Sequence, residues 1–171
     1  MTRFADGEVL VKTLSNVKGK DAIVIESTYK DAHERIFELL LLLDSINRSG
    51  ANSIQLFIPY FGYSRQERVS WINEPVSCEV VARIIETAGY DSLATFDLHH
   101  PIIEKFFKRS ILNISTSRVF IDYYLNYMKE NNLKPSDIVI VSPDHGANHR
   151  ADALVGPIGE AKVILDKVRA R

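Results

Sequence analysis

Runs of apolar residues alternate along the chain with segments whose apolar positions recur at helical spacing. The short apolar runs predict strands at 22–25, 54–60, 93–98, 138–141 and 163–165. The helical spacing predicts helices at 31–48, 75–88, 119–128 and 151–155. Because strands and helices alternate, we expect successive strands to lie parallel, each pair joined by a helix.

The ends of the first two predicted helices carry residues that start or stop helices. Asp31 is a candidate N-cap and Gly50 follows the last turn of the same helix. Pro75 could open the next helix, and Gly89 would end it. The strands are apolar at consecutive positions, as in a parallel sheet covered by helices on both faces. We therefore predict an α/β fold with a doubly wound, mostly parallel sheet, in a single domain of residues 1–171.

Polar residues are concentrated directly after three of the predicted strands. The three clusters are Ser64–Arg68, Asp97–His100 and Ser142–Gly146. In an open parallel sheet, ligands bind beyond the carboxyl ends of the strands. We therefore expect the three clusters to meet at one edge of the sheet and to form the functional site.

Each cluster allows a structural and a functional interpretation. Arg65 and Arg68 are either solvated loop cations or guanidinium groups that pair bidentately with phosphate oxygens. His99 is either a structural histidine or a ligand, and Asp97 and Asp144 are either turn and N-cap residues or ligands. A carboxylate and an imidazole at neighbouring strand ends could together hold a divalent ion, and Mg²⁺ prefers oxygen ligands.

The composition and the missing motifs narrow the function classes. A formal net charge of −1 gives no support to a nucleic-acid or acidic-membrane partner. The single cysteine, Cys78, excludes an intrachain disulfide and favours a reducing, cytoplasmic setting. The N-terminus lacks the apolar core of a signal peptide, and the longest apolar run, 39–43, is too short to span a bilayer. Neither standard glycine-rich phosphate loop is present, and no G-x-S-x-G elbow is present.

Five segments, taken in order, resemble ribose-phosphate pyrophosphokinases. They are RFADGE at 3–8, IPYFGYSRQER at 58–68, TFDLHH at 95–100, FF at 106–107 and VSPDHGANHRA at 141–151. YSRQ together with DLH and SPD-x-G is the specific part of the pattern. The similarity runs through essentially the whole chain and matches the N-terminal half of the family's proteins, so the second domain and its ribose-phosphate loop are expected to be absent.

The resemblance implies an enzyme that transfers the diphosphoryl group of Mg-ATP to the 1-hydroxyl of ribose 5-phosphate. The product would be phosphoribosyl diphosphate for nucleotide biosynthesis. The resemblance also implies domains like those of type I phosphoribosyltransferases, in a cytoplasmic homo-oligomer built from dimers, often a hexamer. The alternative is a truncated, non-catalytic homologue that acts as a regulatory or structural partner of true synthase subunits.

By the family's pattern, five residues would contact ATP without touching the metal. Arg65 and Gln66 would bind it directly, while Phe4, Asp6 and Glu8 would reach the adenine of an ATP bound by a neighbouring subunit.

Four further residues would act on the phosphates. His99 and Asp144 would contact the metal–ATP complex, with His99 touching both metal and nucleotide. Lys167 and Arg169 would match the Lys and Arg of the family's catalytic flexible loop. Without the resemblance, the favoured interpretation of these last two residues is a frayed basic C-terminus.

Overall fold

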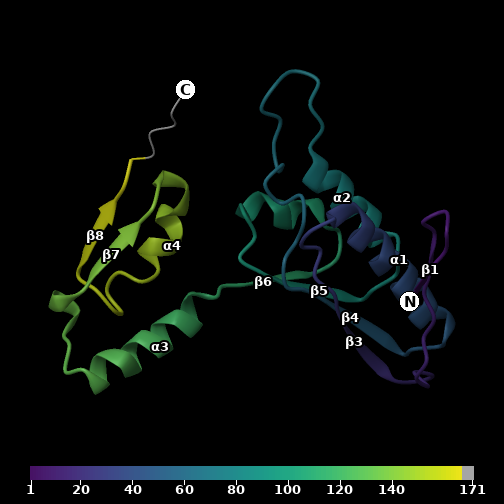
Figure 1. Ribbon diagram of the computed structural model, residues 1–171, viewed down its shortest axis with the longest axis horizontal. Coiled ribbons are helices and arrows are strands. Elements are labelled where there is room, and N and C mark those ends of the chain that lie inside the picture. Colours follow the sequence, from purple (N-terminus) through teal and green to yellow (C-terminus); the bar gives the residue numbers. More distant parts are fainter. Residues whose placement is uncertain (167–171) are drawn as a thin grey trace. The chain divides into compact units, whose positions relative to one another are not determined.

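The computed structural model describes residues 1–166, and the chain divides into two compact units, residues 1–114 and 115–171 (Figure 1). The first unit contains two short strands, a four-stranded sheet and three helical segments. Its elements are β1 (Thr2–Arg3), β2 (Val9–Leu10), β3 (Asp21–Ile25), α1 (Ala32–Arg48), β4 (Ser53–Ile58), α2 (Ser77–Glu86), β5 (Ser92–Phe96), the 3₁₀ helix η1 (Pro101–Phe106) and β6 (Ile111–Ile114). The prediction of one domain for residues 1–171 stays a prediction.

The second unit has its own small core. Its elements are α3 (Ser117–Glu130), η2 (Pro135–Asp137), β7 (Val139–Ser142), η3 (His145–Ala147), α4 (Asn148–Asp152) and β8 (Ala161–Ile164). Strands β7 and β8 are parallel. Met128, Ile140, Ala151 and Ile158 are the buried residues that hold this unit together.

The sheet of the first unit is parallel throughout, in the order β3-β4-β5-β6. Val24 pairs with Leu56, Leu56 with Leu93 and Leu93 with Ile111. All four strands therefore end at the same edge, and the loops that follow β3, β4 and β5 lie along it. The predicted α/β class with a parallel sheet is confirmed.

One face of this sheet is packed against α1, α2 and η1. Alternate strand residues point into that layer because side chains alternate across a strand. The sheet contributes Val24, Ile54, Leu56, Ile58 and Leu93, and the helices contribute Leu39, Leu43, Val81, Ala82, Ile85 and Ile103, all in one buried cluster. This core holds the strands in place, and the polar loops begin where those strands end.

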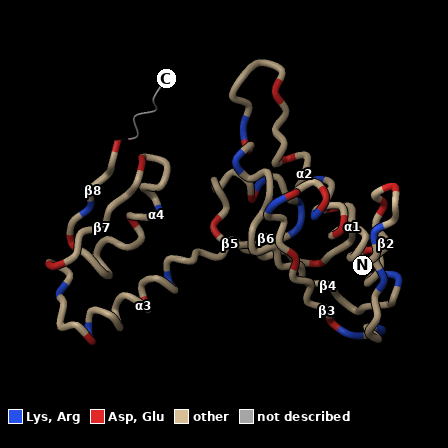
Figure 2. The backbone as a smooth tube through the Cα atoms, in the orientation of Figure 1, with Lys and Arg blue, Asp and Glu red and all other residues tan. Residues whose placement is uncertain are grey.

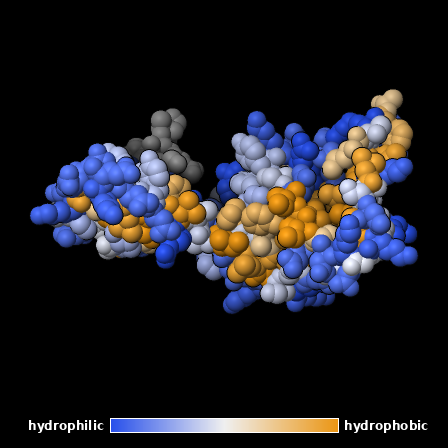
Figure 3. Space-filling model, turned by 90° about the horizontal axis from the view of Figure 1, so that it is seen from below, coloured by the Kyte–Doolittle hydropathy of each residue, from blue (hydrophilic) through white to orange (hydrophobic). Residues whose placement is uncertain are grey.

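The opposite face of the sheet carries exposed apolar side chains. Ile23 and Ile25 of β3 are 70% and 64% exposed, and Leu112 of β6 is 60% exposed. The rings of Phe57 and Phe96 meet edge to face with their centroids 5.0 Å apart. Figure 3 shows a broad hydrophobic area on the larger unit. The helices of residues 1–114 thus cover only one of the two faces.

Most element predictions are confirmed, with shifted ends. α1 covers the predicted helix 31–48, whereas α2 begins at Ser77, two residues after Pro75, and β4 ends at Ile58. α4 occupies 148–152 rather than 151–155, because Val155 instead forms a bridge with Gly159.

Strand β6 and the β1–β2 hairpin were not predicted from the sequence. β6 has only four residues with a polar Asn113 inside it, and each hairpin strand has two, so neither produces a clear apolar run. Within residues 1–166, every helix is too short or too polar to cross a bilayer.

Candidate functional site

The loops that follow β3 and β4 enclose a pocket of about 290 Å³ at the carboxyl edge of the sheet. The loop between β3 and α1 forms one wall, and the chain that leaves β4 forms the other. The lining residues are Thr28, Tyr29, Lys30, Asp31, Ala32, Tyr60, Gly62, Tyr63, Arg65 and Gln66. Two residues of the predicted nucleotide site, Arg65 and Gln66, are therefore brought together here.

Thr28 ties the two walls of this pocket together. Its side chain is buried, with the residue only 1% exposed. Its hydroxyl group donates to the Tyr60 carbonyl oxygen at 2.8 Å and accepts from the Gly62 amide at 2.6 Å. The Thr28 amide also donates to the Tyr60 carbonyl at 3.1 Å. Three hydrogen bonds from one residue hold the β4 loop against the β3 loop.

The two loops approach each other closely at Gly62. A Cβ atom at this position would lie 3.0 Å from the Cβ of Ala32 and 3.0 Å from the carbonyl oxygen of Thr28. It would also lie 3.1 Å from the Thr28 hydroxyl oxygen. Only glycine fits without displacing a wall of the pocket. The sequence FGYSRQ can therefore turn directly against the start of α1.

Four residues at this edge of the sheet have a positive φ although they are not glycine. Lys30 and Asp31 follow β3 with φ of 54° and 45°, Tyr63 follows β4 with 63°, and Asp97 follows β5 with 38°. Such conformations are uncommon for residues with a side chain and gather at functional sites. The strained positions mark the same edge that the polar clusters mark.

The pocket is suited to an anion. The start of α1 forms part of its wall, and the Asp31 side chain makes no capping hydrogen bond, since the residue is left-handed. The predicted N-cap position is therefore right, but the predicted side-chain cap is absent. Arg65 is exposed, and its guanidinium group forms no hydrogen bond or ion pair within residues 1–166.

Gln66 is held more firmly than Arg65. Its side-chain oxygen accepts from the Ser77 hydroxyl at 2.7 Å, which links the loop to the first residue of α2. Its backbone carbonyl accepts from the Cys78 amide at 3.2 Å. These two hydrogen bonds attach the loop at Gln66 to the start of α2. The adjacent guanidinium group of Arg65 is left available for a ligand.

Cys78 and Glu67 are buried behind the pocket. Cys78 is 0% exposed, and burial, with the nearby Glu67 carboxylate, raises the pKa of its thiol to about 12. The Glu67 side chain is 7% exposed and lies 3.7 Å from the guanidinium group of Arg68. Cys78 is therefore a packing residue and not a nucleophile.

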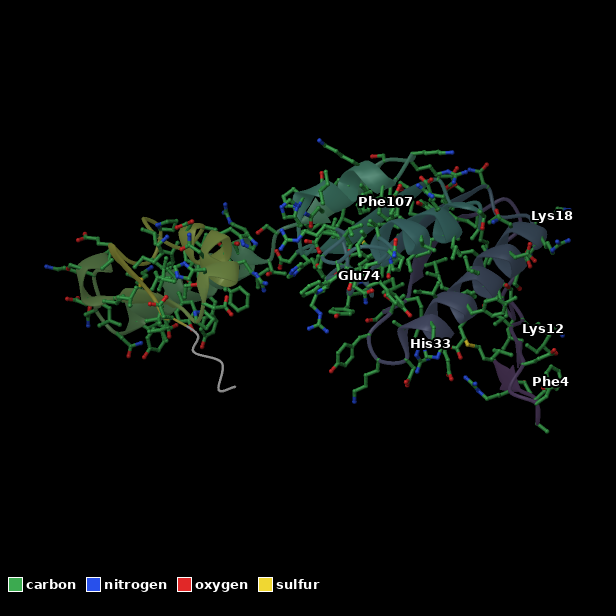
Figure 4. All side chains as sticks on the ribbon, turned by 90° about the horizontal axis from the view of Figure 1, so that it is seen from above. Phe4, Lys12, Lys18, His33, Glu74 and Phe107 are labelled. Carbon is green, nitrogen blue, oxygen red and sulfur yellow. The ribbon has the colours of Figure 1, made fainter. Side chains whose placement is uncertain are left out.

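The β1–β2 hairpin presents three of the predicted adenine-contact residues to solvent. Phe4 is 50% exposed and projects from the hairpin at the rim of the unit (Figure 4). Asp6 and Glu8 are also exposed, and they line a groove of about 660 Å³ between the hairpin and α1. The turn is closed by the Phe4 amide, which donates to the Glu8 carbonyl at 2.8 Å, and by Gly7 with φ of 95°.

Arg3 attaches this hairpin to α1. Its guanidinium group lies 2.8 Å from the Glu34 carboxylate and 3.4 Å from that of Glu38. Basic and acidic residues are interleaved where the hairpin runs beside the helix (Figure 2). The three predicted contact residues are therefore carried by a hairpin with a defined attachment, although none of them lines the Arg65 pocket.

His99 and His100 follow β5 at the carboxyl edge of the same sheet. His99 is exposed, and its ring has no hydrogen-bond partner within residues 1–166. His100 has a structural role, because its Nδ1 atom accepts from the Ile102 amide at 3.1 Å and caps η1. The predicted ligand is the histidine that the fold leaves available.

Asp144 lies in the second unit, at the end of β7. Its Oδ1 atom accepts from the Ala147 amide at 2.9 Å and caps η3. Within residues 1–166 there is no group of three or more His, Cys, Asp or Glu side chains arranged to hold a metal ion. The predicted pair of His99 and Asp144 is thus divided between two units, and its metal role stays a prediction. Lys167 and Arg169 lie outside the described residues.

Sequence reasoning missed the contribution of the β3 loop. Thr28, Tyr29 and Lys30 of this loop line the pocket, and Thr28 holds it together. A signal was present, because Glu26–Asp31 is a polar run directly after the strand at 22–25, like the three clusters that were selected.

Fold and pocket together define an α/β protein with a parallel sheet and an anion-type pocket at the carboxyl ends of its strands. The family model that describes the N-terminal domain of ribose phosphate pyrophosphokinase matches residues 1–89 of this sequence. The chain belongs to the ribose-phosphate pyrophosphokinase family.

Individual relatives agree with this assignment. The chain is 41% identical over 169 residues to the ribose-phosphate pyrophosphokinase of Campylobacter jejuni, covering 99% of this chain and 53% of the relative. It is 39% identical over 169 residues to that of Corynebacterium ammoniagenes, covering 99% and 51%. The crystal structure of phosphoribosylpyrophosphate synthetase from Mycobacterium smegmatis matches with a TM-score of 0.86 at 28% identity, covering 99% of this chain and 55% of that one. The chain spans about half the length of these relatives.

Proposed function

We propose that the chain supplies the ATP-binding half of a ribose-phosphate diphosphokinase. The reaction transfers the diphosphoryl group of Mg-ATP to the 1-hydroxyl of ribose 5-phosphate and forms phosphoribosyl diphosphate for nucleotide biosynthesis. The observation that carries the proposal is the pocket between the β3 and β4 loops, with Arg65 and Gln66 in its wall. Family membership supplies the reaction type.

Arg65 and the start of α1 would bind the phosphates of ATP. Diphosphoryl transfer depends on charge neutralisation and in-line positioning more than on acid–base chemistry. An exposed guanidinium group without an ion pair in residues 1–166 can give two parallel hydrogen bonds to phosphate oxygens. The uncapped first turn of α1 adds favourable backbone dipoles in the same pocket. Gln66, held by Ser77, would orient the bound nucleotide.

Phe4, Asp6 and Glu8 would bind adenine on a neighbouring subunit. They are exposed on the attached hairpin and do not line the pocket that contains Arg65. This position favours a role across an interface. A groove of about 380 Å³ between α1 and α2 supports assembly, because its lining is mostly apolar and includes the exposed Phe37 and Val80. We propose a dimer-based homo-oligomer acting in the cytoplasm.

Magnesium would be held by His99, Asp144 and the phosphates of ATP. The donor types fit, because Mg²⁺ binds through few protein groups when nucleotide phosphates complete its shell, and a carboxylate is among the groups present. Bound Mg²⁺ would neutralise charge on the diphosphoryl group. In this proposal, Lys167 and Arg169 neutralise further charge on the transferred group.

The test is release of AMP from ATP that depends on ribose 5-phosphate, measured on the protein as its gene encodes it. We expect turnover, and we expect His99→Ala and Lys167→Ala to lower it strongly while the circular dichroism spectrum is unchanged. Normal turnover by both variants would show that these site assignments are wrong. ATP binding without any turnover would instead support the alternative, a non-catalytic partner of true synthase subunits.

A further inference from the structure

A second group of basic residues lies at the opposite edge of the sheet. Arg83 and Thr87 come from the end of α2, and Lys108 and Arg109 come from the turn between η1 and β6. Helix α2 ends just before β5 begins, and the turn precedes β6 directly, so this group lies at the amino ends of the strands. Phe107, labelled in Figure 4, is the residue directly before this turn.

These residues line an open pocket of about 610 Å³, which is within the size range of small-molecule sites. Three cationic side chains, the carboxylate of Glu86 and the polar Thr87 form its lining. The lining therefore carries a formal charge of +2 in a chain whose formal net charge is −1. Such a concentration of positive charge attracts an anion.

The carboxylate in this pocket is already engaged by the backbone. The Oε1 atom of Glu86 accepts from the amides of Lys108 and Arg109, the second at 2.9 Å. The turn 108–109 thus directs two N–H groups at an anionic oxygen, in the manner of backbone anion sites. Glu86 orders the turn while its charge partly offsets the cations.

Among residues 1–166, the two cations of the turn have no acidic partner of their own. Neither Lys108 nor Arg109 forms an ion pair with a carboxylate within residues 1–166, whereas Arg83 pairs with Glu79. The Arg109 guanidinium group donates to the Glu86 carbonyl oxygen at 2.8 Å and lies 5.2 Å from the centre of the Tyr90 ring. Arg109 is therefore oriented, and Lys108 is free to swing toward a ligand.

We propose that this amino-edge pocket binds a phosphate or diphosphate group, either free or carried by a nucleotide. Arg109 gives the oriented hydrogen bonds and Lys108 gives the mobile positive charge. Arg83 adds a positive charge that Glu79 partly offsets. The site is separate from the Arg65 pocket, because the two lie at opposite edges of one parallel sheet. A bound anion would contact both the end of α2 and the turn before β6.

The test uses the chain with Arg65→Ala, so that binding at the carboxyl edge is removed from the measurement. Inorganic diphosphate and ADP are titrated separately, and the backbone amide resonances of Thr87, Lys108 and Arg109 are followed by NMR. We expect these resonances to shift with either probe. A higher affinity for ADP than for inorganic diphosphate identifies a nucleotide site, and equal affinities identify a site for the free anion.

Three further variants decide whether the pocket cations cause the binding. Lys108→Ala, whose side chain has no partner in residues 1–166, should weaken the affinity about tenfold, and Glu86→Gln should raise it by removing the opposing charge. Lys105→Ala is the matched control, because Lys105 is exposed nearby but does not line the pocket. An affinity unchanged by Lys108→Ala, or weakened equally by Lys105→Ala, overturns the proposal, as does the absence of any shift at the three amides.

Discussion

Replacing Thr28 by valine tests whether its hydroxyl group holds the pocket between the β3 and β4 loops together. Valine has nearly the same shape as threonine but can neither accept nor donate a hydrogen bond. In the protein the hydroxyl accepts from the Gly62 amide at 2.6 Å and donates to the Tyr60 carbonyl at 2.8 Å. Valine therefore leaves the buried Gly62 N–H group without its acceptor.

The expected loss in the free energy of unfolding depends on which groups lose a hydrogen-bond partner. The Tyr60 carbonyl keeps a bond from the Thr28 amide at 3.1 Å, so the unpaired group is the Gly62 amide. A buried donor without a partner costs roughly 1–3 kcal/mol, and we expect Thr28→Val to lower the free energy of unfolding by about 2 kcal/mol. Thr28→Ser keeps the hydroxyl and removes one buried methyl group, which costs about 1 kcal/mol.

Urea denaturation of the two variants measures this difference, with equal m-values as the check that only stability has changed. ATP affinity should follow the same order, because the hydroxyl fixes both walls of the pocket. The reasoning is refuted if Thr28→Val is as stable as Thr28→Ser and binds ATP equally well. In that case the hydroxyl bonds contribute nothing measurable to the loops.

Three further predictions concern packing and ionisation in the first unit. Gly62→Ala should lower the free energy of unfolding by roughly 1–3 kcal/mol and weaken ATP binding, measured by denaturation and calorimetry, because its Cβ would press on the β3 loop at 3.0 Å. Cys78 should react with a thiol reagent such as Ellman's only after denaturation, since burial raises its pKa to about 12; fast labelling of the native protein would contradict its burial. Stability measured by urea titration should fall as the pH rises from about 9 toward 12. The folded state raises the pKa of Cys78 from 9.0 and of Tyr90 from 10.0, each to about 12, so the unfolded chain loses these protons first. A free energy of unfolding that stays constant between pH 9 and 12 would show that folding does not raise these two pKa values.

Periodicity predicted the larger elements well because their apolar residues meet a single core. Helix α1 and strands β3, β4 and β5 were found within a few residues of their ends, since each contributes several residues to one buried cluster. The parallel order then placed the polar loops after β4 and β5 on one edge. The pattern thus identified the clusters that contain Arg65 and His99 but left their roles open. The roles expected for Arg65, Gln66 and His99 come from the family resemblance.

Features that depend on contacts distant in sequence could not be predicted in this way. The Thr28 hydroxyl matters because Gly62, 34 positions away, approaches it. The cap on η1 by His100, and the absence of a side-chain cap at Asp31, depend on backbone angles that apolar periodicity does not encode. Two-residue strands such as β1 and β2 depend on the attachment of Arg3 to α1.

The most direct test of the central claim is the affinity of the chain for Mg-ATP when Arg65 is changed. Isothermal titration calorimetry should give an affinity about tenfold weaker for Arg65→Lys, because an ammonium group cannot form the two parallel bonds of a guanidinium group. Arg68→Ala is the matched control, since Arg68 is 80% exposed beside Glu67 and does not line the pocket. Unchanged affinity in Arg65→Lys, or an equal loss in Arg68→Ala, would contradict the assignment of the β3–β4 pocket as the phosphate site for ATP.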